Sequence, residues 1–213
     1  TTVRPSGKAV AVAQDRSVEK NFIRDSGLPV GPFFVIRSAE DLDAAAKAIK
    51  FPAVLKTARF GYDGKGQARV QSTVELATVY ASWNGALCVL EEFLPLEKEI
   101  SVVLARTAKG EIATFPVAEN QHANGILDIT IAPARIDEKT ATEARHLAET
   151  LAAKLDYVGV LAVEFFILKD GRLLINEIAP RPHNSGHYTI DACRTNQFQQ
   201  QQRAICGLPL GDP

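Results

Sequence analysis

The sequence predicts an α+β fold made of two unlike lobes. In the first ninety residues, segments with helical periodicity alternate with short apolar segments that read as strands. After Glu99 the pattern changes to longer strands that follow one another largely without intervening helices, which favours an antiparallel sheet. We therefore expect an N-terminal helix and a small lobe at residues 1–92, followed by a larger lobe at residues 93–213.

The first lobe is expected to contain three helices and four strands. Val18, Phe22 and Ile23 give the first helix an apolar face, and Gly27 ends it. Ser38 is a suitable N-cap for the second helix. The helices are expected at Val10–Ser26, Ser38–Lys50 and Ser72–Trp83, and the strands at Phe33–Ile36, Ala53–Thr57, Ala68–Gln71 and Leu87–Phe93.

The second lobe is expected to contain five strands and one long helix. The helix, Glu138–Leu155, has an apolar stripe that includes Leu147 and Leu151. The step Asp170-Gly171 predicts a hairpin turn. A glutamine cluster at 199–202 is interpreted as solvated helix surface. The strands are expected at Ile100–Arg106, Glu111–Val117, Leu127–Ala132, Val160–Leu168 and Arg172–Ile178.

Composition excludes several classes of protein. The chain has 213 residues, of which 46% are apolar and 23% charged, so a packed core is expected and disorder is not. The net charge of -1 gives no excess of positive charge for nucleic acid. No apolar run approaches the roughly 20 residues of a membrane helix. Three cysteines at spacings that match no zinc pattern favour a reducing cytoplasm.

A glycine-rich loop and a lysine point to phosphate binding. The loop FGYDGKGQ, residues 60–67, lies between two expected strands, and its glycines would let backbone amides approach phosphate oxygens. Its spacing is not that of a Walker A loop, and a plain hairpin turn is the alternative. Lys56 ends a buried strand, where an amine needs an anionic partner. That partner is either a ligand or an internal salt bridge.

Two acidic residues in adjoining strands predict a cation site. Glu164 lies within an apolar strand, and Glu177 follows Asn176 at the end of the next one. If the Asp-Gly turn pairs these strands, the two carboxylates face each other, which is costly unless a cation lies between them. Oxygen ligands favour magnesium over zinc. A hydrogen-bonded carboxyl pair is the alternative.

The segment after Glu177 is rich in groups that bind anions. Pro180 and Pro182 stiffen it, and Arg181 suits a planar anion such as carboxylate, bicarbonate or phosphate. Two histidines and an amide follow within a few residues. His122, by contrast, is interpreted as a lone loop histidine that could be surface.

Taken together, these residues resemble the ATP-grasp superfamily, whose two lobes hold ATP between them. Within it, the segments GYDGKGQ and NEIAPRPHNSGHYT are similar to motifs of the 5-(carboxyamino)imidazole ribonucleotide synthases of purine biosynthesis, also called the ATPase subunit of phosphoribosylaminoimidazole carboxylase. The resemblance extends from about Val3 to the end of the chain. The features that carry it, in order, are Lys56, the loop 61–67, Glu91-Glu92-Phe93-Leu94, Glu99, Glu164 and Asn176-Glu177.

The resemblance implies an ATP-grasp ligase that forms a carbon–nitrogen bond with ATP and Mg²⁺. ATP, bicarbonate and aminoimidazole ribonucleotide would give N5-carboxyaminoimidazole ribonucleotide, ADP and phosphate, through carboxyphosphate. Family members carry an N-terminal α/β domain and a smaller C-terminal domain, which help to build the ribonucleotide site and the usual homodimer. We expect this chain to be part of such a longer polypeptide, and turnover by the chain alone is left open.

The resemblance also implies roles for individual residues. Phosphate contacts would come from Arg16, Lys56 and a closing loop formed by Gly61, Tyr62, Asp63, Gly64, Lys65, Gly66 and Gln67. Adenine would contact Glu91, Glu92, Phe93 and Leu94, and the ribose would contact Glu99 with His122 nearby. Magnesium would be held by Glu164, Glu177 and Asn176. Bicarbonate or the ribonucleotide would be oriented by Arg181, His183 and Asn184, with Asp63 reaching toward the acceptor.

Two other functions stay open at this point. Another ATP-grasp carboxylate-amine ligase would keep the nucleotide site and use a different acceptor, and only the RPHNSGH segment and Asp63 argue against it. A non-catalytic nucleotide-binding module belongs to a different class. Glu164 and Glu177 argue against that module, because a domain that only binds nucleotide does not need two costly carboxylates.

Overall fold

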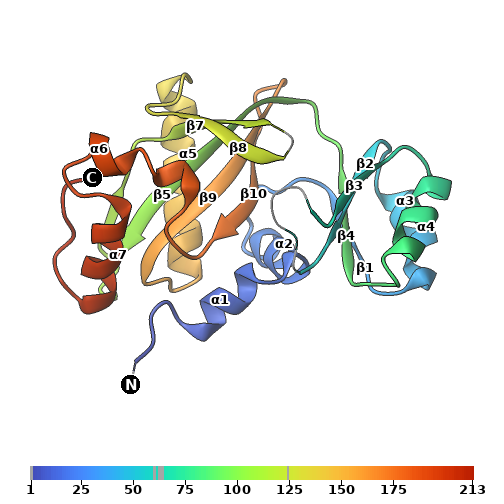
Figure 1. Cartoon of the computed structure of the whole chain (residues 1–213), viewed down its shortest axis with the longest axis horizontal. Coiled ribbons are helices and arrows are strands. Elements are labelled where there is room, and N and C mark those ends of the chain that lie inside the picture. The colour runs from blue at the N-terminus through green and yellow to red at the C-terminus, as the bar shows by residue number, and fades with distance from the viewer. Residues whose placement is uncertain (1, 60, 62–64, 124) are drawn as a thin grey trace.

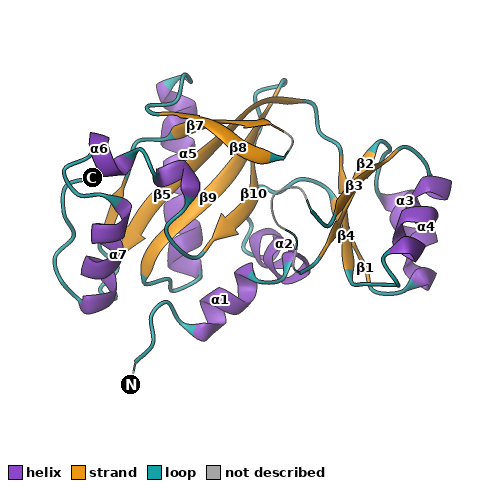
Figure 2. Ribbon diagram, in the orientation of Figure 1, coloured by secondary structure: helices purple, strands orange, loops and turns teal. Residues whose placement is uncertain are grey.

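The chain folds around two antiparallel sheets, each covered by its own helices (Figures 1 and 2). The computed structural model describes residues 2–59, 61, 65–123 and 125–213. The first sheet has four strands in the order β1-β4-β2-β3. The second has six, in the order β10-β9-β5-β7-β8, with β6 paired to β5. The predicted α+β class is therefore confirmed.

The first sheet and its helices lie on the right of Figure 1. Helices α3 and α4 pack on one face of it, and their shared core contains Ala45, Leu76 and Leu90. The side chain of Ser72 caps α4 by accepting from Glu75 N–H. The elements are β1 (Phe33–Ile36), α3 (Leu42–Ala48), β2 (Ala53–Thr57), β3 (Gln67–Val70), α4 (Thr73–Ser82) and β4 (Cys88–Glu92).

The second sheet is longer and is covered on both faces. Its elements are β5 (Leu96–Arg106), β6 (Ile112–Thr114), β7 (Ala118–Ala123), β8 (Ile126–Ile131), α5 (Glu138–Lys154), β9 (Gly159–Leu168), β10 (Leu173–Ala179), α6 (Thr189–Ala192) and α7 (Gln197–Cys206). In the part of the chain that is described, no helix combines the length and apolarity needed to cross a membrane. The predicted long helix and the Asp-Gly hairpin are both confirmed.

The predicted helix Val10–Ser26 is wrong, because the structure has two helices there. Helix α1 spans Gly7–Ala13 and α2 spans Arg16–Asp25. The side chain of Asp15 accepts from the N–H groups of Ser17 and Val18 and so begins a new helix. By packing, α1 and α2 belong to the core of the second sheet, so the range 1–92 is not one packing unit.

Side chains along β9 alternate between the two faces of the second sheet. Leu161 and Val163 pack in the core that also contains residues of α1, α2 and α5. Val160 and Ala162 pack on the opposite face, against Cys193 and Leu210. Because side chains alternate along a strand, Glu164 lies on this second face.

Strand β7 was not predicted, because its sequence AENQHA is largely polar. Glu119 fixes this strand to the segment before α5. Its buried carboxylate accepts from Arg135 Nη2, from Arg135 Nε at 3.1 Å and from Lys98 Nζ at 3.2 Å. The hydrogen bonds from Arg135 lower the pKa of Glu119 to about 2. These contacts thus hold the hairpin of β7 and β8 to β5 and to the segment before α5.

We expect Glu119→Gln to lower the free energy of unfolding by about 2 kcal/mol at pH 7, because two cations lose their carboxylate. The folded pKa lies below the ordinary 4.5, so this stabilisation is fully present above pH 4.5 and is lost as the pH falls toward 2. Urea unfolding of both proteins should show a smaller difference at pH 3 than at pH 7. An equal difference at both pH values would contradict this role.

Candidate active site

A cleft of about 580 Å³ opens between the two sheets. Most side chains predicted to act lie in it, although they come from distant parts of the sequence. Tyr62, Asp63 and Gly64 lie outside the described residues. The predicted residues that line the cleft are Arg16, Lys56, Gly61, Lys65, Gly66, Gln67, Glu99, His122, Glu164, Asn176, Glu177, Arg181, His183 and Asn184.

Glu164 and Glu177 face each other across β9 and β10, as the hairpin predicted. A β-bulge makes this possible. Ile175 pairs with Phe165, but the next pair is Glu177 with Glu164, so Asn176 is an extra residue in β10. Strict alternation would have placed Glu177 in the apolar core beside Ile175. The bulge instead turns both Asn176 and Glu177 toward the cleft.

The charges around this pair fit a bound cation. Burial, and then the carboxylate of Glu177, raise the pKa of Glu164. Burial also opposes ionisation of Glu177, but the guanidinium of Arg16, with Nη2 at 2.6 Å, lowers its pKa. The buried Oδ1 of Asn176 has no hydrogen-bond partner within the described structure. A cation among these three residues would satisfy the amide oxygen and offset the repulsion between the carboxylates.

These donors fit Mg²⁺, which takes part of its ligands from substrate and water, better than a metal whose ligands all come from the protein. Nowhere among the described residues do three or more His, Cys, Asp or Glu side chains gather in a metal-binding group. Mg²⁺ is usually held by one or two carboxylates together with substrate phosphates and water. The arrangement of Glu164, Glu177 and Asn176 therefore suits a metal that arrives with a nucleotide.

Glu91 is the anion at the centre of a buried cluster of cations. Its Oε2 lies 3.0 Å from Lys56 Nζ and 3.4 Å from Lys20 Nζ, and its Oε1 lies 3.4 Å from Arg16 Nη1. Burial opposes its ionisation, but the three cations together lower the pKa of Glu91. The internal salt bridge considered for Lys56 therefore exists. Arg16 also contacts Glu177, so a second carboxylate offsets part of this positive charge. Arg16 and Lys56 nevertheless line the cleft, where they can contact phosphate.

Two functional candidates on α2 were missed by the sequence analysis. Lys20 is only 2% exposed and contacts Glu91. Glu19 accepts a hydrogen bond of 2.5 Å from the N–H of Ile178, which directly follows Glu177. Burial raises the pKa of Glu19. Their spacing was the available signal, since Arg16, Glu19, Lys20 and Ile23 share one helix face that ends in the apolar core.

A smaller, largely apolar cavity of about 110 Å³ adjoins the cleft at Lys56. Its lining includes Glu92, Phe93, Leu94 and Phe166. The Arg69 guanidinium lies 3.9 Å from the centre of the Phe93 ring. An apolar slot beside a polar cleft suits a flat heterocycle that carries phosphates. The predicted adenine contacts therefore lie together, while the side chain of Glu91 also faces the cations described above.

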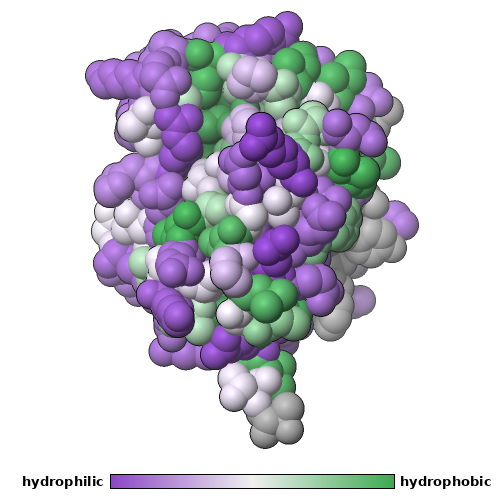
Figure 3. Space-filling view, turned by 90° about the vertical axis from the view of Figure 1, so that its left-hand side faces the viewer, coloured by the Kyte–Doolittle hydropathy of each residue, from purple (hydrophilic) through white to green (hydrophobic). Residues whose placement is uncertain are grey.

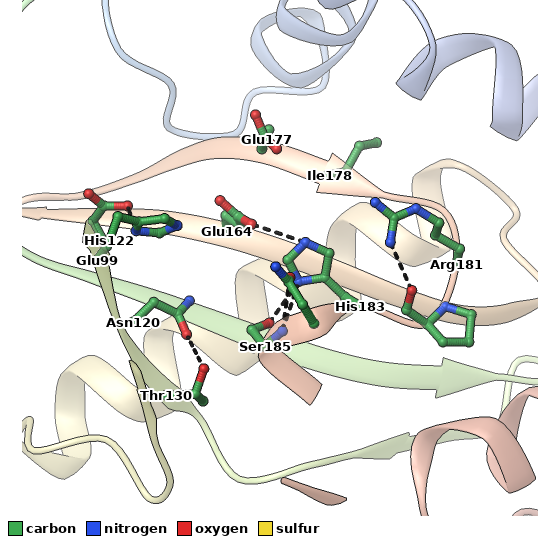
Figure 4. A network of polar contacts seen from close by, with 12 residues as sticks. Glu99, Asn120, His122, Thr130, Glu164, Glu177, Ile178, Arg181, His183 and Ser185 are labelled. Carbon is green, nitrogen blue, oxygen red and sulfur yellow. Dashed lines mark hydrogen bonds and ion pairs between the residues drawn. The ribbon is translucent and has the colours of Figure 1, made fainter. Parts of the chain in front are cut away.

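The prediction that His122 lies in a loop is wrong, because it lies on a strand, while its exposed position agrees with the surface interpretation. The side chain of His122 on β7 is 25% exposed, and its Nδ1 is 3.0 Å from Oε2 of Glu99 on β5 (Figure 4). The hydrogen bond to Glu99 raises the pKa of His122. Figure 4 shows Glu164 between this pair and His183. The sequence did not reveal the contact between His122 and Glu99, because β7 is largely polar and lacks the apolar periodicity by which a strand is predicted.

The described part of the glycine-rich loop is tightly folded against β2. Gly66 has a positive φ of +69°, and a Cβ there would lie 2.5 Å from Oγ1 of Thr57. The N–H of Thr57 donates to the carbonyl of Gly66 at 2.8 Å. Glycine is thus required at this position both by conformation and by space. Gly61 and Lys65 line the cleft nearby.

The segment after β10 presents His183 to Glu164. Ser185 N–H donates to His183 Nδ1 at 3.3 Å, and because this nitrogen accepts, the ring proton is assigned to Nε2. Nε2 lies 3.3 Å from Oε1 of Glu164. Burial, and then Arg181, lower the pKa of His183 to about 4, so the ring is neutral near pH 7. Arg181 lies at the exposed edge of the cleft, where Nη1 donates to the carbonyl of Pro182.

Comparison with known proteins agrees with this geometry. The sequence model of the ATP-grasp domain family matches residues 21–198. The chain belongs to the ATP-grasp family. The two sheets with a polar cleft between them are therefore those of an ATP-grasp fold, as the sequence motifs predicted.

Individual relatives of this ATP-grasp chain carry a more specific name. N5-carboxyaminoimidazole ribonucleotide synthase of Bacillus subtilis (strain 168) is 46% identical over 208 residues, which are 97% of this chain and 55% of the relative. A crystal structure of an N5-carboxyaminoimidazole ribonucleotide synthetase in complex with ADP has a TM-score of 0.91 and 48% identity, covering 96% of this chain and 54% of that one.

A third similar protein was solved with two small molecules. The synthase of Aspergillus clavatus in complex with ADP and 5-aminoimidazole ribonucleotide has a TM-score of 0.91 and 28% identity, over 99% of this chain and 55% of that chain. The ATP-grasp chain thus spans about half the length of the relatives that it matches. The resemblance stated from the sequence motifs is confirmed at the level of these similarities.

Proposed function

We propose that this chain is the ATP-binding part of an enzyme that carboxylates aminoimidazole ribonucleotide in purine biosynthesis. The observation that carries the proposal is one continuous cleft, which joins the Glu164–Glu177 carboxylates to the loop of Arg181 and His183. The name of the Bacillus subtilis relative and the ribonucleotide in the Aspergillus clavatus complex support it.

ATP is proposed to span the two cavities. Its adenine would lie in the apolar cavity beside Phe93 and Leu94, and its ribose hydroxyls would bind Glu99. Its phosphates would then lie between Lys56, Arg16 and the glycine-rich loop, where the two cationic side chains offset their negative charge. Only the described residues of that loop enter this proposal.

Mg²⁺ would be held by Glu164, Glu177 and Asn176. When bound, it neutralises charge on the phosphates during phosphoryl transfer. Arg16 contacts Glu177 directly, and His183 Nε2 points at Glu164, so each carboxylate has a neighbour that fixes its orientation. The chain's own contribution is therefore a preorganised pair of anions in a cleft that Arg16, Lys56 and Arg181 also line.

The chemistry needs two anions to meet in line. A bicarbonate oxygen attacks the γ-phosphorus, the bond to the β-phosphate oxygen breaks, and carboxyphosphate and ADP result. The amine of the ribonucleotide then attacks the carboxyl carbon, phosphate leaves, and the amine loses one proton. Arg181 can grip bicarbonate at two points, and holding both reactants supplies most of the rate enhancement without a covalent nucleophile.

The proposal extends to the lobes, the cellular location and the partners of the whole protein. The small lobe is proposed to end near residue 92, at the connection from β4 to β5, while α1 and α2 before it pack on the large lobe. The whole protein is proposed to act in the cytoplasm, as a homodimer, on small molecules rather than nucleic acid. The residue roles given above extend this proposal to the site, except for Tyr62, Asp63 and Gly64, which lie outside the described residues.

The proposal is tested by measuring ADP release with and without bicarbonate and aminoimidazole ribonucleotide. Two proteins are assayed: the chain itself, and a joined form in which it replaces the matching segment of the Bacillus subtilis relative. We expect ADP release by the joined form to require both co-substrates. Release that is independent of the ribonucleotide would favour another ATP-grasp ligase, and no release by an ATP-binding joined form would favour a binding module.

Arg181→Lys in the joined form is expected to lower kcat/KM for bicarbonate about 100-fold, or ~2.7 kcal/mol, because lysine cannot copy a two-point grip. ADP affinity, measured by calorimetry, should stay within about twofold, since Arg181 is remote from the adenine cavity. The exposed Arg172→Lys on the hairpin turn is the control and should change neither quantity. Equal losses of affinity and turnover would place Arg181 in the nucleotide site.

A further inference from the structure

Gln197, at the start of α7, is fully buried and holds the backbone of His183 at two points. Its Oε1 accepts from His183 N–H at 2.9 Å, and its Nε2 donates to the carbonyl of His183 at 2.7 Å. The exposed fraction of Gln197 is 0%. One amide side chain therefore satisfies both backbone groups of a residue in the proposed acceptor loop.

The loop needs such support because of its sequence. Pro180 and Pro182 have no N–H groups, so the segment cannot continue the ladder of β10. His183 lies just beyond the second proline, and no strand of the described structure pairs with it. The side-chain amide of Gln197 takes the place of the missing strand.

The clamp also extends to the next residues of the loop. A Cβ on Gly186 would lie 2.5 Å from Oε1 of Gln197, so glycine is what lets the amide approach. The Gly186 carbonyl accepts from Thr189 Oγ1 at 2.7 Å, and that oxygen accepts from Gln197 N–H at 3.1 Å. With Ser185 N–H on Nδ1, the whole turn is fixed so that Nε2 of His183 faces Glu164.

We propose that Gln197 is a positioning residue, which sets the backbone of His183 and thereby the place of bicarbonate relative to the carboxylate pair. This inference rests on the proposed function for its kinetic part only. The interpretation of the glutamine cluster at 199–202 as solvated helix surface holds for Gln199 and Gln202, which are exposed, and is wrong for Gln200, which is buried like Gln197. The surface over α6 and α7 mixes hydrophilic and hydrophobic residues and gives no sign of the buried amides (Figure 3).

The same helix provides a matched control. Gln200 is also 0% exposed and makes the same two-point contact, with Oε1 3.0 Å from Gly211 N and Nε2 2.7 Å from Gly211 O. Gly211 belongs to the C-terminal segment and not to the cleft. Gln197→Met and Gln200→Met each keep side-chain length and each remove two hydrogen bonds to the backbone of one residue, although the His183 carbonyl still accepts from Gly186 N–H at 3.0 Å. Their losses of stability should therefore be similar.

The first readout is the imidazole of His183, observed by ¹⁵N NMR of the chain. In the parent and in Gln200→Met we expect an unprotonated Nδ1 and a protonated Nε2. In Gln197→Met the signals should move toward the average of the two tautomers. Gln197→Glu, which keeps the acceptor but loses the donor, should give an intermediate spectrum, and it serves if Gln197→Met does not fold.

The second readout is the kinetics of the joined form. Gln197→Met is expected to raise KM for bicarbonate at least about tenfold, because a small displacement of a positioning group is costly. KM for ATP and the affinity for ADP should stay within about twofold. Gln200→Met should match the parent in all of these.

Equal spectra and equal kinetics for the two methionine variants would overturn the proposal. So would equal losses for ATP and bicarbonate in Gln197→Met, which would indicate general loosening. If the parent joined form consumes no bicarbonate, the proposed function fails instead. In that case the NMR comparison still decides whether Gln197 sets His183.

Discussion

Replacement of Glu177 by glutamine is expected to abolish Mg²⁺-dependent ATP turnover while the fold stays intact. The amide keeps an acceptor for Arg16, which lies 2.6 Å from the carboxylate, but it loses the charge that a hard cation needs. We expect a loss of at least about 1000-fold in kcat, or ~4 kcal/mol. The measurement is ADP release by the joined form over a range of Mg²⁺ concentrations.

The control for this variant is Glu143→Gln, on the exposed surface of α5, which should behave like the parent. Circular dichroism and thermal unfolding of Glu177→Gln should resemble those of the parent. The fold is expected to persist because removing one of two facing carboxylates also relieves the repulsion between them. Activity that stays within about threefold of the parent, a difference of less than ~1 kcal/mol, would show that Glu177 does not hold the metal.

The largest effect on stability is expected for Glu91→Gln. The variant would leave Lys20 and Lys56 in a buried place without their shared carboxylate, and breaking a buried ion pair costs about 3–5 kcal/mol. Urea unfolding at pH 7 measures the change in the free energy of unfolding. We expect the same variant to weaken ADP binding, since the cations that face the phosphates lose their fixed positions.

A second substitution separates charge from packing at this position. Lys20→Met removes one of the unpaired cations, so the double variant Glu91→Gln/Lys20→Met should be more stable than the sum of the single losses indicates. A loss below about 1 kcal/mol for Glu91→Gln, or strictly additive losses, would show that Glu91 does not hold the cluster together.

Much of the fold could be predicted because its elements follow simple periodicity. The long apolar stripe of α5, the serine before α4 and the Asp-Gly turn between β9 and β10 each specify their element locally. The same turn predicted that Glu164 and Glu177 face each other. The pairing of the two strands was therefore accessible from sequence, but the facing carboxylates also depend on the bulge at Asn176, which the turn does not show.

The rest depended on contacts between distant segments. Asp15 divides the first helix because its side chain caps a new one and also binds Arg59 at 2.8 Å. The bulge at Asn176 changes which face Glu177 occupies, and the sequence shows it only as a spacing of three between Ile175 and Ile178. Nothing in the local sequence indicates that Gln197 is buried, because its partner His183 lies 14 residues earlier in the chain.

The central claim is that bicarbonate is phosphorylated and then carboxylates the ribonucleotide amine. It is tested most directly by following oxygen from ¹⁸O-labelled bicarbonate in the joined form, with ATP and aminoimidazole ribonucleotide present. Attack on the γ-phosphorus carries one bicarbonate oxygen into the phosphate that leaves when the amine reacts. We therefore expect one ¹⁸O in each phosphate released, together with carboxylated ribonucleotide. Phosphate that carries no label while ATP is consumed would contradict the account.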